Sequence, residues 1–328
     1  MKRNLKDGTK LNNNHNTLST FIYTYACRPE ELTLCQMEMR ALFGMETDVP
    51  ILKSSVEIDP SRSPFIKERI DVLYEGDNLQ SILEQVNQLQ LKNDTFKVYF
   101  VKINDLDESE KVPFAKRREI EREIGLQMNG EADLDQPDVI FGIVTFGGRW
   151  YFGNYQTSKS FWWHHLKKPR EYSTALSTRV ARAVVNIAVP NPEGIQVIDP
   201  CCGIGTVLVE ALSMGIKIVG RDINPLATDG SKENIAHFGY ECEVVTGPIS
   251  EVTKKYDVAI IDMPYNLLTR ATPEEQQSIL EHARKITAKL VVVTSEDMDA
   301  MIHEAGFAIK DRCITSKSLF TRHVLLCE

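Results

Sequence analysis

The sequence has no apolar run long enough to cross a membrane, and its seven cysteines include neither a C-x-x-C pair nor any other zinc-type spacing. No secretory signal pattern opens the chain. An odd number of cysteines, scattered along the chain, is typical of reduced thiols that serve as small apolar residues. We therefore expect a cytoplasmic protein with no metal and no membrane partner. Internal repeats and low-complexity tracts are absent as well.

Positive charge is in deficit, because 38 Lys and Arg face 46 Asp and Glu, for a net charge of −8. This argues against indiscriminate nucleic-acid binding, although the distribution of charge matters more than its total. Two basic clusters stand out, and aromatic and His side chains interleave with the first: Lys159, Lys167, Lys168, Arg170, Arg179 and Arg182 with Trp162, Trp163, His164 and His165, and then Lys116, Arg117, Arg118 and Arg122. Either cluster alone can be a solvated helix face. The position of the first, between two domains, favours a surface that contacts phosphates.

The chain of 328 residues is long enough for two domains. We expect residues 1–18 to be a flexible leader, 19–155 an α+β region and 156–172 a basic aromatic linker. In the α+β region we predict strands at 21–25, 51–56, 96–103, 139–144 and 150–152, and helices at 29–43, 65–74, 79–89 and 114–128. Gly147-Gly148 is typical of a hairpin turn.

Residues 173–328 alternate regularly between strand and helix. We predict strands at 196–199, 217–222, 243–246, 256–262, 290–294, 307–314 and 324–327, and helices that include 174–188, 273–286 and 297–304. The last two strands are close enough in sequence to pair antiparallel. The fold class is therefore α/β, with a seven-stranded Rossmann-like, doubly wound sheet preceded by an α+β domain.

A glycine turn follows the first of these strands. The strand ends at Asp199, and Gly203-Ile204-Gly205 leads into a helix, so the backbone can approach a ligand closely. Asp222 ends the next strand, twenty-three residues later, where such folds place the acid that holds ribose hydroxyls. A third glycine is missing, which disfavours a dinucleotide. The cofactor pattern points to S-adenosylmethionine, held by Asp199, Cys202, Gly203, Gly205, Thr206, Asp222 and Ile223.

Asp262-Met263-Pro264-Tyr265 ends another apolar strand. This segment resembles the Asp/Asn-Pro-Pro-Tyr signature of methyltransferases that modify exocyclic amino groups. Because Asp is also common at strand-to-helix turns, each acid alone has an ordinary structural explanation. Together, the Asp262 carboxylate, the Met263 carbonyl, Pro264 and the Tyr265 ring predict a catalytic site for a planar amine.

The chain resembles the tRNA guanine-N2-methyltransferases of the guanosine-10 type, which join a THUMP RNA-binding domain to a Rossmann-like catalytic domain. The resemblance is carried by residues 197–206, by 176–188 and, in the first half, by 118–125 and 132–139. It implies an S-adenosylmethionine-dependent RNA methyltransferase that acts on guanine N2, with structured RNA, and tRNA in particular, as partner. Three residues differ from the motifs of the family: Cys201 and Ile204 in motif I, and Met263 in the amine motif. In addition, Pro248 stands where the family has an acid that contacts the adenine amine.

Two other classes of function stay open from the residues alone. The amine motif also serves ribosomal RNA, DNA and protein-glutamine methyltransferases, and Pro248 would suit a non-catalytic RNA-binding relative. The basic aromatic linker argues against the DNA and protein substrates, and Asp262 with Tyr265 argues against the loss of catalysis.

Overall fold

The computed structural model of the chain describes residues 19–91, 93–103, 111–172, 175–264, 271–317 and 320–328. The predicted leader, 1–18, lies outside them. The chain divides into two compact units. Unit 1 consists of the described parts of Met1–Ala26, Thr47–Ser61 and Ile66–Lys159, and unit 2 of those of Cys27–Glu46, Arg62–Phe65 and Ser160–Glu328.

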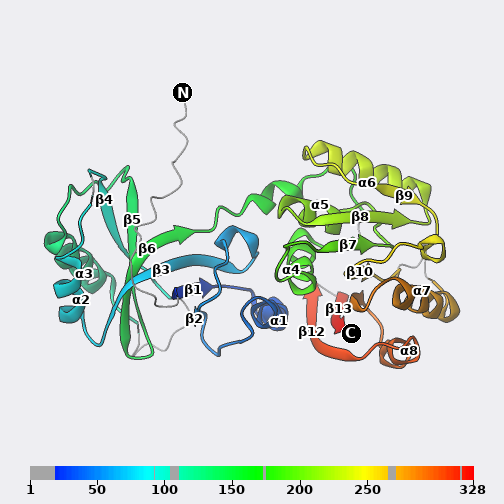
Figure 1. The fold of residues 1–328 in the computed structure, drawn as a ribbon, viewed down its shortest axis with the longest axis horizontal. Helices are drawn as coiled ribbons and strands as arrows, with labels where there is room; N and C mark the ends of the chain where they lie inside the picture. The colour runs from blue at the N-terminus through cyan, green and yellow to red at the C-terminus, as the bar shows by residue number, and fades with distance from the viewer. Residues whose placement is uncertain (1–18, 92, 104–110, 173–174, 265–270, 318–319) are drawn as a thin grey trace. The chain divides into compact units, whose positions relative to one another are not determined.

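Unit 1 is built on a six-stranded sheet with the strand order β2-β1-β3-β6-β5-β4 (Figure 1). Only β4 and β5 pair in parallel, and the helix between them covers one face together with the other helix of the unit. The elements are β1 (Phe21–Tyr25), β2 (Ile51–Ser54), β3 (Ile66–Gly76), α2 (Leu79–Val86), β4 (Phe96–Phe100), α3 (Phe114–Gln127), β5 (Val139–Phe146) and β6 (Arg149–Thr157). The predicted α+β class of this region is confirmed. The hairpin is confirmed too, since Gly147 and Gly148 both take positive φ, 58° and 74°, between β5 and β6.

One predicted helix, 65–74, is wrong, because this segment is strand β3, paired with both β1 and β6. Two features hide the strand alternation. The register shifts between Val72 and Tyr74, which moves the later side chains to the opposite face. In addition, Arg69 is almost fully buried, and its guanidinium pairs with Asp71 at 2.6 Å and Glu57 at 3.2 Å. Arg69, a buried charged residue, therefore stands at a position where the alternation of a strand requires an apolar one.

Unit 2 contains the predicted seven-stranded sheet, with the order β12-β13-β11-β10-β7-β8-β9. The strands are parallel except β13, which runs antiparallel between β11 and β12, as predicted for the last two strands. They are β7 (Gln196–Asp199), β8 (Lys217–Asp222), β9 (Val244–Thr246), β10 (Val258–Asp262), β11 (Lys289–Thr294), β12 (Ile309–Lys317) and β13 (Phe320–Cys327). The strand order reverses beside β7, and ligands of such sheets bind outside the carboxyl ends of the strands at that point.

Helices cover this sheet (Figure 1). They are α4 (Thr178–Ala188), α5 (Thr206–Ser213), α6 (Pro225–His237), α7 (Pro273–Ile286) and α8 (Asp299–Glu304), with 3-10 turns at Pro29–Glu31, Pro60–Arg62, Phe161–Leu166 and Ile249–Glu251. A core that includes Ala259, Ile261, Leu280 and Ile302 joins the sheet to α7 and α8. Helix α4 begins four residues later than predicted, because Ser177 caps it by accepting a hydrogen bond from Val180 N.

A helix from the beginning of the chain belongs to unit 2. This helix, α1 (Leu32–Phe43), lies beside α4 and β12 (Figure 1). It ends at Gly44, which has a φ of 70° and allows the chain to turn away. Leu34, Met37 and Met39 of α1 are fully buried. Burial of side chains of this size stabilises a fold by about 1.5–3 kcal/mol each. The units therefore do not follow the linear boundary predicted near residue 155.

Polar side chains are buried where α1 meets α4. Glu38 accepts hydrogen bonds from Asn186 Nδ2 at 2.7 Å and from Ser63 Oγ at 2.5 Å. Arg62 donates from Nε to Asn186 Oδ1 at 3.0 Å. Burial raises the pKa of Glu38 to about 7. A polar network of this kind is satisfied only in one arrangement, so it fixes how α1 and residues 62–65 dock on α4.

Candidate functional site

Backbone hydrogen bonds close the glycine turn after β7. Gly205 N donates to the carbonyl of Cys202 at 2.8 Å, and Cys202 N donates to the carbonyl of Arg221 at 2.9 Å. Gly203 and Gly205 have φ of 52° and 78°, a region that glycine enters without strain. A Cβ on Gly205 would lie 2.4 Å from Ser231 Oγ, whereas a Cβ on Gly203 would meet open space. Gly205 is therefore needed for packing, and Gly203 keeps the turn accessible.

Asp222, at the end of β8, is tied to this turn. Its Oδ2 accepts from Gly203 N at 2.8 Å and its Oδ1 from Asn224 N at 2.9 Å. Two backbone donors hold the carboxylate in one orientation, and each oxygen keeps a further lone pair for a ligand hydroxyl. Ile223 follows and is 72% exposed, so an apolar side chain lies next to the acid at the surface.

Three acids lie near one another at the carboxyl ends of β7, β8 and β10. Asp199 is buried, and its Oδ1 accepts from Cys201 N at 3.2 Å. Burial raises the pKa of Asp199 well above its ordinary value, and the charges of Asp262 and Asp222 raise it further. Because burial favours the neutral form of Asp199, the carboxylates of Asp222 and Asp262 supply the negative charge here, which repels a pyrophosphate and favours a cationic group such as a sulfonium. The residues at this site therefore fit S-adenosylmethionine and do not fit a dinucleotide.

The amine motif begins at the same edge of the sheet. Asp262 ends β10 and is half-buried, and Met263 N donates to the Val293 carbonyl at 2.9 Å. The Met263 side chain is buried in the core with α7, so only its backbone is available for a ligand. Pro264 follows, half-buried. Tyr265 lies outside the described residues. The structure thus brings Asp262 close to Asp199 and Asp222.

The remaining predicted cofactor residues support the turn. Cys202 is buried, and burial raises the pKa of both its thiol and that of Cys201, which suits packing rather than thiolate chemistry. Thr206 is the first residue of α5 and is nearly buried. Its Oγ1 accepts a hydrogen bond from Lys168 Nζ at 2.6 Å.

The contact of Lys168 with Thr206 is one that the sequence analysis missed. Asn234 of α6, fully buried, holds the same segment: its Nδ2 donates to the carbonyls of Arg170 and Ile204, and its Oδ1 accepts from Arg170 N. Residues 168–170 of the predicted linker are therefore fixed against the glycine turn. The only sequence signal for these contacts was Asn234 itself, because an Asn in the middle of a helix is neither a good helix former nor a cap.

The backbone around Pro248 is held by Arg221. Arg221 donates from Nε to the carbonyls of Gly247 at 3.0 Å and Pro248 at 2.8 Å, and its guanidinium pairs with Glu251. Gly247 N in turn donates to the Asp222 carbonyl at 2.9 Å. The loop after β9 is thus shaped by its backbone and by Arg221 rather than by an acid at position 248.

The basic aromatic linker divides into buried and exposed residues. Trp162 and His165 are buried, and His165 Nδ1 lies 2.7 Å from Glu210 Oε1, while Arg182 Nη1 donates to Glu210 Oε2 at 2.7 Å. These side chains serve packing between the linker, α4 and α5. Phe161 and Trp163, in contrast, are 57% and 62% exposed, and Lys167 and Arg170 are exposed beside them in the chain.

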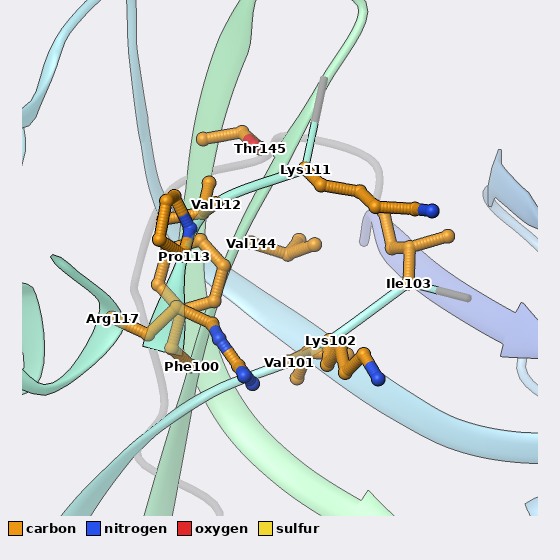
Figure 2. Close-up of a pocket in the computed structure, with 10 residues that line it drawn as sticks. All are labelled: Phe100, Val101, Lys102, Ile103, Lys111, Val112, Pro113, Arg117, Val144 and Thr145. Carbon is orange, nitrogen blue, oxygen red and sulfur yellow. The ribbon is translucent and has the colours of Figure 1, made fainter. Parts of the chain in front are cut away.

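Unit 1 has its own cationic pocket, with a volume of about 340 Å³. Figure 2 shows Lys102 and Arg117 with their nitrogens toward the same side of it, and Lys111 extending from the adjoining segment. Of the predicted cluster on α3, Lys116 and Arg118 pair with Glu119 and Glu121, as on a solvated helix face. Arg117 is the member that lines the pocket.

Within the described residues, no group of three or more His, Cys, Asp or Glu could hold a metal ion. No helix among them is long and apolar enough to cross a membrane. The seven cysteines, all among the described residues, form no disulfide with one another.

The chain is similar to several known proteins. Residues 166–312 match the family model described as RMKL-like, methyltransferase domain. The chain is similar to the tRNA (guanine(10)-N2)-dimethyltransferase of Methanothermobacter thermautotrophicus, with 24% identity over 289 residues, 78% of this chain and 82% of that protein. It is 28% identical to the enzyme of the same name from Methanocaldococcus jannaschii over 207 residues, 57% of this chain and 58% of the relative. Among solved structures, TrmN from Thermus thermophilus matches with a TM-score of 0.46 and 15% identity, over 94% of this chain and 99% of that one.

Proposed function

Starting from a methyltransferase domain of the RMKL-like kind over residues 166–312, we propose that this protein is an S-adenosylmethionine-dependent RNA methyltransferase that modifies guanine N2 in tRNA. The observation that carries the proposal is the position of Asp262 beside Asp199 and Asp222, at the sheet edge where the glycine turn lies. The names of the curated relatives support the substrate. We place the protein in the cytoplasm, where seven free thiols stay reduced.

The cofactor supplies a methyl group on a positively charged sulfur. Gly203 and Gly205 let the backbone approach it, Asp222 accepts hydrogen bonds from the ribose hydroxyls, and Ile223 offers an apolar contact to the adenine ring. The Asp222 and Asp262 carboxylates would attract the positive charge of the sulfonium and so help to hold the cofactor.

An exocyclic guanine amine is a poor nucleophile, because its lone pair is delocalised into the ring. In our proposal the amine donates hydrogen bonds to the Asp262 carboxylate and to the Met263 carbonyl. These bonds strengthen as the nitrogen becomes tetrahedral and positive, so they stabilise the transition state more than the ground state. Tyr265 would stack on the base, which must leave its helix or loop to reach the site.

RNA binding is proposed for unit 1 and for the linker. The pocket with Lys102, Lys111 and Arg117 offers cations for backbone phosphates, and Phe161 and Trp163 offer exposed rings. We propose that unit 1 acts as the THUMP-like RNA-binding region that the resemblance implies.

Mass spectrometry of nucleosides tests the proposal. A strain that lacks the gene should lose N2-methylated guanosine from its tRNA fraction, and purified protein with S-adenosylmethionine should restore it. Loss confined to ribosomal RNA would keep the chemistry and reject tRNA as substrate. A methyl mark missing from DNA alone, with all RNA nucleosides intact, would reject the RNA assignment.

A further inference from the structure

Unit 2 has a pocket that none of the three acids lines. Its volume is about 360 Å³, and residues from four separate segments line it. Three are arginines and three carry hydroxyl groups: Arg28, Arg179, Arg322, Ser177, Thr315 and Ser316. Glu30 and Glu31 line it as well, so three guanidinium groups face two carboxylates and one positive charge is in excess.

Arg179 is held in place inside this pocket. Its Nε and Nη2 donate to the two carboxylate oxygens of Glu31 at 2.9 and 2.8 Å, which leaves Nη1 outside the pair. The guanidinium also lies over the Phe65 and Trp162 rings, 5.2 and 5.4 Å from their centroids. A planar guanidinium fixed in this way loses little conformational entropy when it binds an anion.

The strand register places the pocket at the carboxyl edge of the sheet. Asp262 pairs with Val293, Val293 pairs with Val324, and Arg322 lies two residues beyond Val324 toward that edge, opposite Thr315. Strands are about 4.8 Å apart, so β13 and β12 lie roughly 10–14 Å from β10. A short stretch of nucleic acid spans this distance.

We propose that this pocket binds a backbone phosphate of the RNA close to the nucleotide that is methylated. The proposal rests on the proposed function for the identity of the ligand. Guanidinium and hydroxyl groups are the donors that phosphate oxygens accept, and the N-terminus of α4, capped by Ser177, adds a partial positive charge. Anchoring a phosphate there orients the strand so that the base reaches Asp262.

Arg28 gives the sharpest test, since its side chain is 74% exposed and its ion pair with Glu30 is long, at 4.0 Å. Arg28→Ala should weaken tRNA binding about fivefold, and Arg28→Glu about tenfold or more. The slope of log K against log salt concentration should fall by roughly 0.7–0.9. Arg179→Lys keeps the charge and removes the planar fork, and should weaken binding as well. S-adenosylmethionine affinity, from calorimetry, should stay as in the wild type.

Arg312→Ala and Arg312→Glu are the matched controls, because Arg312 lies on β12 outside the pocket and is 51% exposed. Equal tRNA affinity and salt slope in the Arg28 and Arg312 variants would overturn the proposal. Calorimetry with inorganic phosphate alone tests a free anion as the ligand. Phosphate binding that is lost in Arg28→Glu while tRNA affinity is unchanged would overturn the RNA assignment. A wild-type protein that binds tRNA through Arg28 but methylates no tRNA guanine would instead reject the proposed function.

Discussion

The carboxyl edge of the unit 2 sheet has two ends of opposite charge. Asp199, Asp222 and Asp262 gather at the ends of β7, β8 and β10, whereas Arg28, Arg179 and Arg322 gather beside β12, β13 and α4. A cationic cofactor is favoured at the first end and an anionic ligand at the second. In our proposal, one edge keeps two ligands of opposite charge apart while their reacting groups meet between them.

We expect the largest effect from the removal of residues 1–155. The truncation deletes Arg28 and α1 but leaves Asp199, Asp222 and Asp262 in the chain. We expect the remaining fragment not to fold, because the loss of Leu34, Met37, Met39 and Leu42 from the core costs up to about 6–12 kcal/mol, comparable with a whole domain's stability. Thermal unfolding followed by circular dichroism measures this, with the full chain as control. A fragment that unfolds cooperatively at the full chain's Tm would contradict it.

Asp262→Ala should abolish the chemistry at the acidic end. The variant loses the acceptor for the amine at the transition state, so kcat should fall about 10²–10³-fold while cofactor affinity changes little. Transfer of a labelled methyl group to tRNA measures kcat. Asp262→Asn keeps an acceptor oxygen and should retain more activity. Asp257→Asn, at the residue directly before β10, is the control. Near-normal turnover in Asp262→Ala would reject the mechanism.

Glu38→Gln examines the acid that is buried where α1 meets α4, near Arg62 and Arg182. The pKa of Glu38 is about 7 in the folded protein against an ordinary 4.5, so the folded state binds more protons between these values. Stability should therefore fall as the pH rises from about 4.5 to 7, by about 3 kcal/mol. Glu38→Gln should flatten this part of the curve of unfolding free energy against pH. The exposed Glu241→Gln should leave it unchanged, and an equal slope in both variants would contradict the prediction.

Gly205→Ala and Gly203→Ala compare two glycines of the same turn. Both need positive φ, which costs an alanine about 1–2 kcal/mol. Only Gly205 also meets Ser231, so its variant should lose more stability in urea denaturation. Gly203→Ala places a methyl group in the open space and should mainly weaken S-adenosylmethionine binding in calorimetry. The reverse order of the two stabilities would show that the contact with Ser231 relaxes without cost.

Asp222→Ala should have the smallest effect. It removes the tie to Gly203 N and the proposed acceptor for the ribose hydroxyls, so cofactor affinity should fall about tenfold, or about 1.4 kcal/mol. Asp229→Ala, on an exposed face of α6, is the control for the loss of a charge. Unchanged affinity in calorimetry would remove Asp222 from the ribose role.

The amino-acid sequence by itself determined the parts of this protein that depend on local order. Apolar strands that end in Asp199, Asp222 and Asp262, two glycines in a turn and a regular alternation of elements were enough to predict the seven-stranded sheet and the acidic end of its edge. Parallel strands bring their carboxyl ends to one side, so residues far apart in sequence meet there by a general rule.

Only the tertiary structure decided the rest. The sequence pattern did not predict strand β3, because buried Arg69 and a register shift interrupt its alternation. Helix α1 packs in unit 2 because its apolar face and Glu38 find their partners on α4. The arginine pocket joins Arg28, Arg179 and Arg322 from segments about 150 residues apart, as their numbers show. No local pattern encodes such a meeting, since each arginine alone is equally compatible with a solvated surface, and long-range packing brings them together.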